Sequence, residues 1–196
     1  MSESRKALIT ATIDLVAEDG FINLTTRKIS KRAGVSTGLL YDYFSSKEDL
    51  LFECFREINS EVFALFDSFR IPENMGKEDQ LKFIRKYWET SFRYMLNSGN
   101  KGLFYYQYID AEGLIHLYDQ RSDAFNTEIL ELAKPYVDGM YQELQDEKAC
   151  MNIVWTVLVN GTGSFVKVIL RKRMKFEDSQ MDVIWRSLTG GLESYT

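Results

Sequence analysis

Four basic residues fall within six positions near the start of the chain, directly after threonines at 25 and 26. Lysine and arginine side chains neutralise phosphates, and hydroxyl groups donate hydrogen bonds to phosphate oxygens. A guanidinium also matches the O6 and N7 atoms of guanine in the major groove. These residue types at this spacing, in a cluster of Arg27, Lys28, Lys31 and Arg32, predict contact with double-stranded DNA through Arg27. Lys28 and Arg32 lie on the flank of the helix, where the alternatives of a solvated side chain and a phosphate contact stay open.

Three short helices are expected to position these groups. Helices over 3–19 and 25–33 end at Gly20 and Gly34, where glycine readily adopts a positive φ. Ser36 is placed to cap a third helix of barely two turns. Two short helices joined by a tight turn form a helix-turn-helix, whose second helix enters the DNA major groove.

The third helix has two distinct faces at about 100° per residue. Its inward residues are Leu40 and Phe44. Its outward residues are Gly38, Leu39 and Asp42, flanked by Thr37, Tyr41 and Tyr43. An apolar Leu39 on the outward face suits a thymine methyl group, whereas Asp42 suits DNA only if it accepts from cytosine N4 or pairs with a cation. The role of Asp42 stays open.

The rest of the chain also has helical periodicity. The chain of 196 residues is 45% hydrophobic and contains two prolines, which predicts an all-α protein. A long helix from 46 to about 69, opened by a capping box at 46–49, joins a DNA-binding domain over 1–48 to a helical domain over 49–196. Further expected helices are 77–97, broken segments through 118, a helix from about 123 kinked by Pro135, 150–171 and 181–192.

The charge distribution is more informative than the net charge of −5, which alone counts against a nucleic-acid partner. Residues 1–50 hold seven of the 24 basic and seven of the 29 acidic residues, so the negative charge lies in the remainder. Asp14 and Glu18 interrupt the first apolar stretch, which predicts neither a signal peptide nor a membrane span but a cytoplasmic protein. Cys54 and Cys150 lack pairing or metal-ligand spacing and are interpreted as core thiols.

Aromatic residues are concentrated between Leu81 and Tyr118, where they number ten in 38 positions. Such side chains can form a pocket for a lipophilic or aromatic small molecule, although helical aromatic stripes are more often core. His116 lies in the same region and is interpreted either as a ligand contact or as a hydrogen-bonded structural histidine. The candidate ligand-binding residues are Trp88, Phe92, Tyr105, Tyr106 and His116.

The last two expected helices each carry one apolar stripe. With their counterparts in a second subunit they could form an intersubunit four-helix bundle, or they could close the core of a single subunit. Gly161 and Gly163 would allow a partner helix to approach closely. The candidate dimer-interface residues are Trp155, Leu158, Phe165, Ile184, Trp185 and Leu188.

The stretch LTTRKISKRAGVSTGLLYDYFSSKEDLL, residues 24–51, resembles the DNA-binding segment of the TetR family of transcriptional regulators. The similarity includes the Gly20-Phe21 pair, Ala33-Gly34-Val35-Ser36, Tyr41-x-Tyr43-Phe44 and the Lys47-Glu48-Asp49-Leu50 entry to the long helix. Ser30, where the family usually has alanine, departs from this pattern. The motif covers about a quarter of the chain, and the remainder resembles the family in length and helix order.

The resemblance implies a homodimer whose first three helices bind a near-palindromic operator and whose other helices bind a small molecule. Carried over by position, the residues similar to phosphate contacts are Thr25, Thr26, Tyr41 and Lys47. Those similar to residues near base edges are Arg27, Thr37, Gly38 and Leu39. Ser36 and Tyr43 complete the predicted DNA-binding set.

The favoured interpretation is a dimeric repressor that a small molecule releases from its operator. The alternative is a DNA-bound structural or adaptor protein whose helical domain binds another protein. An enclosed pocket would favour the first, and a filled core with an exposed apolar groove the second. No nucleophile and base pair, metal-ligand spacing or phosphate-binding glycine loop can be named, so neither an enzyme nor a cofactor is predicted.

Overall fold

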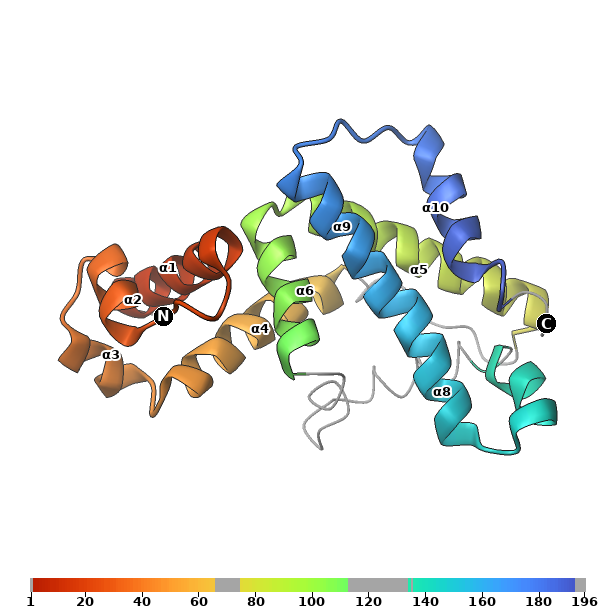
Figure 1. Ribbon diagram of the computed structural model, residues 1–196, viewed down its shortest axis with the longest axis horizontal. Coiled ribbons are helices and arrows are strands. Elements are labelled where there is room, and N and C mark those ends of the chain that lie inside the picture. The colour runs from red at the N-terminus through yellow and green to blue at the C-terminus, as the bar shows by residue number, and fades with distance from the viewer. Residues whose placement is uncertain (1, 66–74, 113–133, 135, 193–196) are drawn as a thin grey trace.

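The computed structural model describes residues 2–65, 75–112, 134 and 136–192, and all regular structure within these ranges is helical. Figure 1 shows α1, α2 and α3 grouped at one end of the molecule. Helix α4 runs from this group towards a larger one made by α5, α6, α8, α9 and α10. The all-α architecture predicted from the sequence is confirmed.

The first three helices begin and end where the capping residues predict. Helix α1 (Glu3–Asp19) ends at Gly20 with φ 72°, and α2 (Thr26–Ala33) ends at Gly34 with φ 69° in the left-handed region. The third helix is α3 (Thr37–Tyr43), which begins after Ser36. Leu40 and Phe44 are buried as expected, at 0% and 2% exposure, and fix α3 on α1.

Helix α4 (Lys47–Ala64) begins with half of the expected capping box. Ser46 Oγ accepts a hydrogen bond from Asp49 N at 3.0 Å. Asp49 Oδ2, however, accepts from Ser45 N at 2.8 Å rather than from the cap residue itself. The expected extension of this helix to about 69 lies outside the described residues.

Helix α5 (Lys77–Asn97) has the predicted bounds, but the expectation of broken helical segments after it is wrong for residues 100–112. These residues form one continuous helix, α6 (Asn100–Glu112). Gly102 lies within this helix, and a Cβ atom there would lie 2.2 Å from Met95 O of α5. The glycine therefore permits close packing of α5 and α6 instead of ending a helix.

The apolar segment near the C-terminus is one long helical run with an irregular turn. It comprises α8 (Glu147–Trp155), a π-helical turn η2 (Thr156–Asn160) and α9 (Gly161–Arg171), and α10 (Ser179–Thr189) follows. Residues 136–144 form a further helical segment before α8. The predicted helix from about 123 lies mostly outside the described residues.

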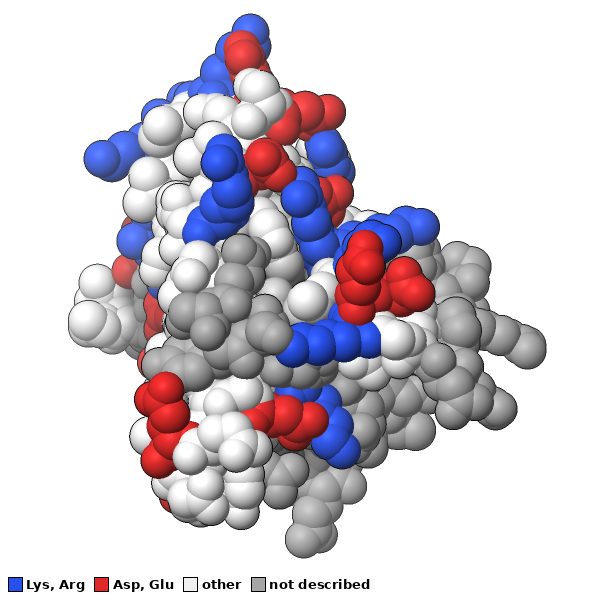
Figure 2. Space-filling model, turned by 90° about the vertical axis from the view of Figure 1, so that its right-hand side faces the viewer, with Lys and Arg blue, Asp and Glu red and all other residues white. Residues whose placement is uncertain are grey.

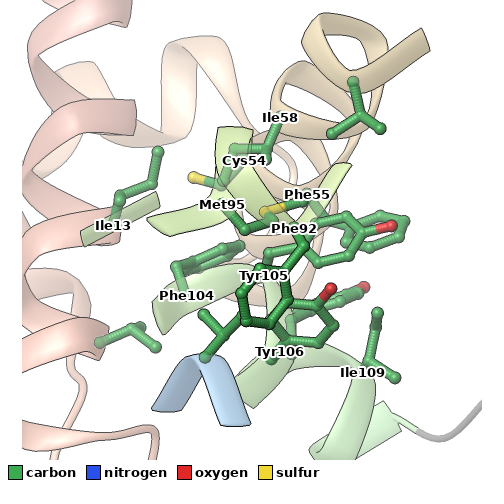
Figure 3. Close-up of a cluster of buried hydrophobic side chains, with 14 of the residues drawn as sticks. Ile13, Cys54, Phe55, Ile58, Phe92, Met95, Phe104, Tyr105, Tyr106 and Ile109 are labelled. Carbon is green, nitrogen blue, oxygen red and sulfur yellow. The ribbon is translucent and has the colours of Figure 1, made fainter. Parts of the chain in front are cut away.

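The hydrophobic core is continuous between the two groups of helices. Figure 3 shows Ile13 of α1 facing a cluster from α4, α5 and α6 that includes Phe55, Phe92 and Phe104. Helix α6 packs against both α1 and α4. The helices next to α2 and α3 therefore share one core with α6.

Candidate functional site

Three of the four clustered cations of α2 are free to meet a ligand. Arg27, Lys28 and Lys31 are exposed, and none of them forms an ion pair with another described residue. Arg32 differs because its guanidinium donates to both carboxylate oxygens of Glu18, at 3.1 and 2.8 Å. These hydrogen bonds lower the pKa of Glu18 and raise that of Arg32. Arg32 therefore ties α2 to α1.

Two hydroxyl groups at the starts of α2 and α3 have the geometry expected of helix caps. Thr25 Oγ1 accepts from Lys28 N at 3.2 Å, and Ser36 Oγ accepts from Leu39 N at 3.1 Å. A hydroxyl that accepts one hydrogen bond keeps its own proton to donate. Both groups can therefore donate to phosphate oxygens while they hold the helix ends in place.

The outward face of α3 largely agrees with the helical-wheel prediction. Gly38 and Asp42 are exposed, Tyr41 is 53% exposed and Tyr43 is 37% exposed. Thr37 and Leu39 are half-buried, so Leu39 offers only part of its side chain to a thymine methyl. Asp42 forms no ion pair with a cation within the described residues, so the pairing considered for it is not seen there.

Packing within the subunit does not require a glycine at position 38. A Cβ atom at this position would meet only Ser36 Oγ, at an ordinary 3.8 Å. A side chain would thus be tolerated by the fold, and alanine has a higher helix propensity. The free space over Gly38 lies on the exposed face of α3, where a backbone or base edge can approach closely.

Sequence reasoning missed two residues that hold α3. Ser2 Oγ donates to the hydroxyl oxygen of Tyr43 at 2.9 Å and also caps α1. Arg5 Nη2 binds Glu53 Oε2 at 2.6 Å, and its guanidinium lies 5.3 Å from the centroid of the Phe44 ring. Both contacts join residues far apart in the chain, so no local pattern could have identified them.

Lys47 and Thr26, the remaining predicted DNA contacts, lie at helix starts. Lys47 is half-buried at the start of α4, and its Nζ is 3.8 Å from Glu48 Oε1, a loose pair that a phosphate could displace. Thr26 is the first residue of α2. The described structure therefore brings the ten predicted DNA-binding residues onto α2, α3 and the helix starts beside them.

Ser30 is an anomaly in the core beneath this surface. The residue is 2% exposed, and its hydroxyl has no hydrogen-bond partner. Leaving a buried polar group unpaired costs about 1–3 kcal/mol. The departure from alanine noted in the sequence therefore has a physical cost.

We expect Ser30→Ala to raise the free energy of unfolding by about 1 kcal/mol, because it removes an unpaired hydroxyl and improves helix propensity. Urea titration followed by circular dichroism would measure the shift. Ser36→Ala is the matched control and should have the opposite sign, since it removes a helix cap. A destabilised Ser30→Ala protein would contradict the assignment of an unpaired hydroxyl.

The predicted ligand-binding aromatics lie deep in the larger group of helices. Trp88 and Phe92 stack with ring centroids 5.1 Å apart, and Tyr105 and Tyr106 meet edge to face at 5.3 Å. Trp88 Nε1 donates to Thr162 Oγ1 at 2.8 Å, and Tyr105 donates to Asn59 Oδ1 at 3.1 Å. His116 lies outside the described residues.

Burial keeps the tyrosines of this cluster neutral. It raises the pKa of the Tyr87, Tyr105 and Tyr106 hydroxyls well above the usual value. Figure 3 shows the hydroxyl oxygens of the cluster on the side away from Ile13. These groups can accept or donate hydrogen bonds, but they carry no charge with which to bind an ion.

Several predicted interface residues are covered by their own subunit. Ile184, Trp185 and Leu188 are buried at 7%, 4% and 8% exposure, and Trp185 packs on Trp88 with centroids 5.1 Å apart. Leu158 and Phe165 are half-buried, and the Trp155 side chain lies outside the described residues. The glycines serve the same packing, since Cβ atoms at Gly161 and Gly163 would lie 2.5 Å from Leu188 and Tyr106.

The two cysteines agree with the expectation of core thiols. Cys54 and Cys150 are both free and fully buried. Burial raises the pKa of the Cys54 thiol far above its usual value, which leaves it protonated and unreactive. Among the described residues no group of three or more His, Cys, Asp or Glu side chains could hold a metal ion.

The fold and this surface together define a helix-turn-helix protein with a larger helical domain. Residues 8–54 match the family described as "Bacterial regulatory proteins, tetR family". Among curated proteins, the HTH-type transcriptional regulator BetI of Klebsiella pneumoniae (strain 342) is 43% identical over 58 residues, 30% of each chain. The Fatty acid metabolism regulator protein of Bacillus subtilis (strain 168) is 42% identical over 50 residues, 26% of each chain.

Solved structures extend the likeness to nearly the whole chain. A TetR family transcription regulator from Marinobacter aquaeolei VT8 superposes with a TM-score of 0.67 at 23% identity, covering 95% of this chain and 93% of that one. The fatty acid degradation regulator FadR from Bacillus halodurans gives 0.52 at 20% identity, covering 96% and 95%. Residues 8–54 therefore match the DNA-binding segment of the TetR family, and nearly the whole chain shares the fold of these structures.

Proposed function

We propose that the protein is a ligand-responsive transcriptional regulator in the cytoplasm, a homodimeric repressor that a small molecule releases from a palindromic operator. The observation that carries the DNA-binding part is the exposed surface of α2 and α3, which holds both cations without an ion-pair partner among the described residues and hydroxyl groups at the helix starts. The curated relatives match only 30% and 26% of their own lengths, and the matched segments include this surface.

DNA recognition follows from the roles of the two helices. Helix α3 would lie in the major groove, with Arg27 reaching guanine and Leu39 a thymine methyl. Thr25, Ser36 and Tyr43 would donate to phosphates and fix the register, and Lys47 would add charge without reading bases. The contacts of Ser2 and Arg5 support this arrangement because they hold the end of α3 against α1 and α4.

Dimerisation is supported by an apolar surface that the single subunit leaves uncovered. The segment Lys148–Arg171 is long and apolar enough to cross a membrane by length and composition, with mean hydropathy 1.6, yet only 29% of its apolar window is buried. Val168 of α9 and Val183 of α10 are 45% and 54% exposed. A second copy that packs α9 and α10 against these residues would cover them, as a helix bundle does, with no membrane involved.

Coupling between the two groups of helices would pass through α6. Gln107 Nε2 donates to Val16 O of α1 at 3.2 Å, and Asn100 Nδ2 donates to Asp14 Oδ1 at 2.8 Å. Lys101 Nζ lies 2.6 Å from Glu61 of α4, which also accepts from the Tyr94 hydroxyl. A ligand that shifts α6 would therefore change the angle between α1 and α4. The spacing of the two DNA-binding domains in the dimer would change with it.

One observation favours the alternative of an adaptor that binds a protein. The described aromatic cluster is closely packed, while an open apolar groove lies between the helical segment 136–144, α8 and the end of α10. A filled core with an exposed groove is the arrangement expected of that alternative. A protein ligand and a small molecule would differ in the area that they bury on this surface.

The proposal is tested most directly by the base-reading role of Arg27. A genomic pull-down of bound DNA fragments would first give the operator. Arg27→Ala should then weaken specific binding by about 1–3 kcal/mol and relax one base position, whereas Lys47→Ala should weaken all sequences alike. Fluorescence anisotropy with matched and mismatched duplexes at fixed salt would separate the two effects.

Arg32→Ala provides the matched control for Arg27→Ala. Both are arginines of the same helix, but the Arg32 guanidinium is held by Glu18 and should contribute little to specificity. If Arg27→Ala bound matched and mismatched duplexes as the wild type does, the placement of α2 on the DNA would be wrong. If the wild type preferred no genomic sequence, the proposed function itself would fail.

A further inference from the structure

The open groove at the far end of the molecule has the size and lining of a small-molecule site. It has a volume of about 350 Å³ and lies between the helical segment 136–144, α8 and the C-terminal end of α10. The residues that matter here are Met140, Glu143, Leu144, Ile153, Leu188 and Leu192, and we refer to it as the α8–α10 groove. Ligand pockets typically occupy about 300–1,000 Å³ and are lined mainly by apolar side chains.

The groove leaves apolar side chains in water. Leu144 is 48% exposed and Ile153 is 40% exposed, although both belong to helices that pack against the core. Covering apolar surface is favourable in proportion to the area removed from water. An apolar ligand placed between these two side chains would gain this energy from both walls at once.

An irregular turn of helix forms part of the same wall. Val157 lines the groove from the π-helical turn η2, and Asn160 lies three residues further in the same turn. Asn160 Oδ1 is buried and accepts no hydrogen bond. π-Helical turns are frequent at functional sites, and an unpaired buried amide oxygen in such a turn is a second sign that this wall is not built for packing alone.

The charge at the groove determines which head group fits. Glu143 is the one ionisable side chain among the described residues that line it. A carboxylate at the edge of an apolar groove attracts a cation and repels an anion. Figure 2, which views the molecule from this end, shows an uncharged area in the lower part of this face, with acidic side chains on both sides of it and basic side chains nearby.

We propose that the α8–α10 groove binds an amphipathic cation, an aliphatic or aromatic body that carries an ammonium group, with the body between Leu144 and Ile153 and the ammonium group at Glu143. The inference names the class of effector, and its regulatory part rests on the proposed function. A groove of about 350 Å³ has room for a small molecule. A stable protein partner needs a larger contact, since it buries about 800 Å² on each side.

A ligand in this groove would act on the helices proposed to meet the second subunit. Leu188 forms its inner wall and packs so closely on α9 that a Cβ atom at Gly161 would lie 2.5 Å from it. A body held between Leu144 and Ile153 and pressed against Leu188 would therefore shift α10 relative to α9. Such a shift changes the subunit interface and with it the spacing of the two DNA-binding domains.

Three probes with the same alkyl chain test the site on the free protein. Octylammonium, octanol and octanoate would each be titrated into the full chain by calorimetry, without DNA. We expect octylammonium to bind more tightly than octanol and octanoate to bind most weakly. Octanoate binding as tightly as octylammonium would overturn the assignment of the charge, and the absence of binding by all three would overturn the site.

Variants then locate the probe. Glu143→Gln should weaken octylammonium up to about fivefold, as expected for an exposed ion pair, and leave octanol unchanged. Asp138→Asn, an exposed carboxylate on the same helical segment that does not line the groove, is the matched control.

Ile153→Trp should fill the groove and Leu144→Lys should repel the cation, and both positions are exposed enough to accept the change. Unaltered octylammonium affinity in both would place the probe elsewhere and refute the proposal.

The regulatory part is measured separately. If octylammonium binds at the groove, it should lower operator affinity, and saturating operator should lower octylammonium affinity by the same factor. Groove binding without this reciprocity would remove the effector role. A wild type that binds octylammonium but no operator would instead defeat the proposed function, so the two failures are distinguishable.

Discussion

Phe92→Ala should lower the free energy of unfolding by about 3–5 kcal/mol, the usual cost of removing a buried phenyl ring. Phe92 is 0% exposed and packs on Trp88 at 5.1 Å and on Phe176 at 5.4 Å between ring centroids. It therefore joins α5 to the connection between α9 and α10. Urea titration at a fixed protein concentration would measure the loss, since a dimer's stability depends on concentration.

Ile22→Ala is the control for this substitution. Ile22 is 97% exposed, so its truncation should change the free energy of unfolding by no more than about 0.5 kcal/mol. A loss of less than about 1 kcal/mol for Phe92→Ala would mean that the ring borders free space. That result would support the prediction that Phe92 contacts a ligand, because a pocket wall loses less packing than a filled core.

Local signals in the sequence were sufficient to predict the bounds of the three N-terminal helices. Gly20 and Gly34 end α1 and α2, and Thr25 and Ser36 cap α2 and α3, because each role depends on the backbone of neighbouring residues alone. The face of α3 followed in the same way from helical geometry. The domain boundary predicted after residue 48 is untested, and the continuous core between α1 and α6 shows why packing does not mark it.

The same reasoning could not decide what covers an apolar face. The periodicity of α10 correctly predicted that Ile184, Trp185 and Leu188 share one face, but not that their own subunit buries it. The sequence likewise left open whether Arg32 is solvated or contacts phosphate, because its partner Glu18 belongs to another helix. Contacts between residues distant in the chain depend on how helices are docked, which short-range patterns do not specify.

Burial of Trp185 changes which residues can test the dimer. A charge at Trp185 would disrupt its packing on Trp88 and unfold the subunit, so loss of the dimer would carry no separate meaning. Val168 and Val183 are exposed in the single subunit, and a charge there leaves the fold intact. These two positions separate association from folding.

The double variant Val168→Glu, Val183→Glu should dissociate the dimer. In the proposed interface each glutamate would be buried without a partner, and an uncompensated buried charge costs about 3–5 kcal/mol. Sedimentation velocity should show a monomer at concentrations where the wild type is dimeric, with an unchanged helical circular dichroism spectrum. Operator affinity should fall at the same time, because two linked half-site contacts become independent.

The control is Met174→Glu, at a side chain 48% exposed in the connection before α10, which should remain dimeric. A double variant that stays dimeric would show that another surface joins the subunits, and a wild type that is monomeric at micromolar concentration would rule out the bundle altogether.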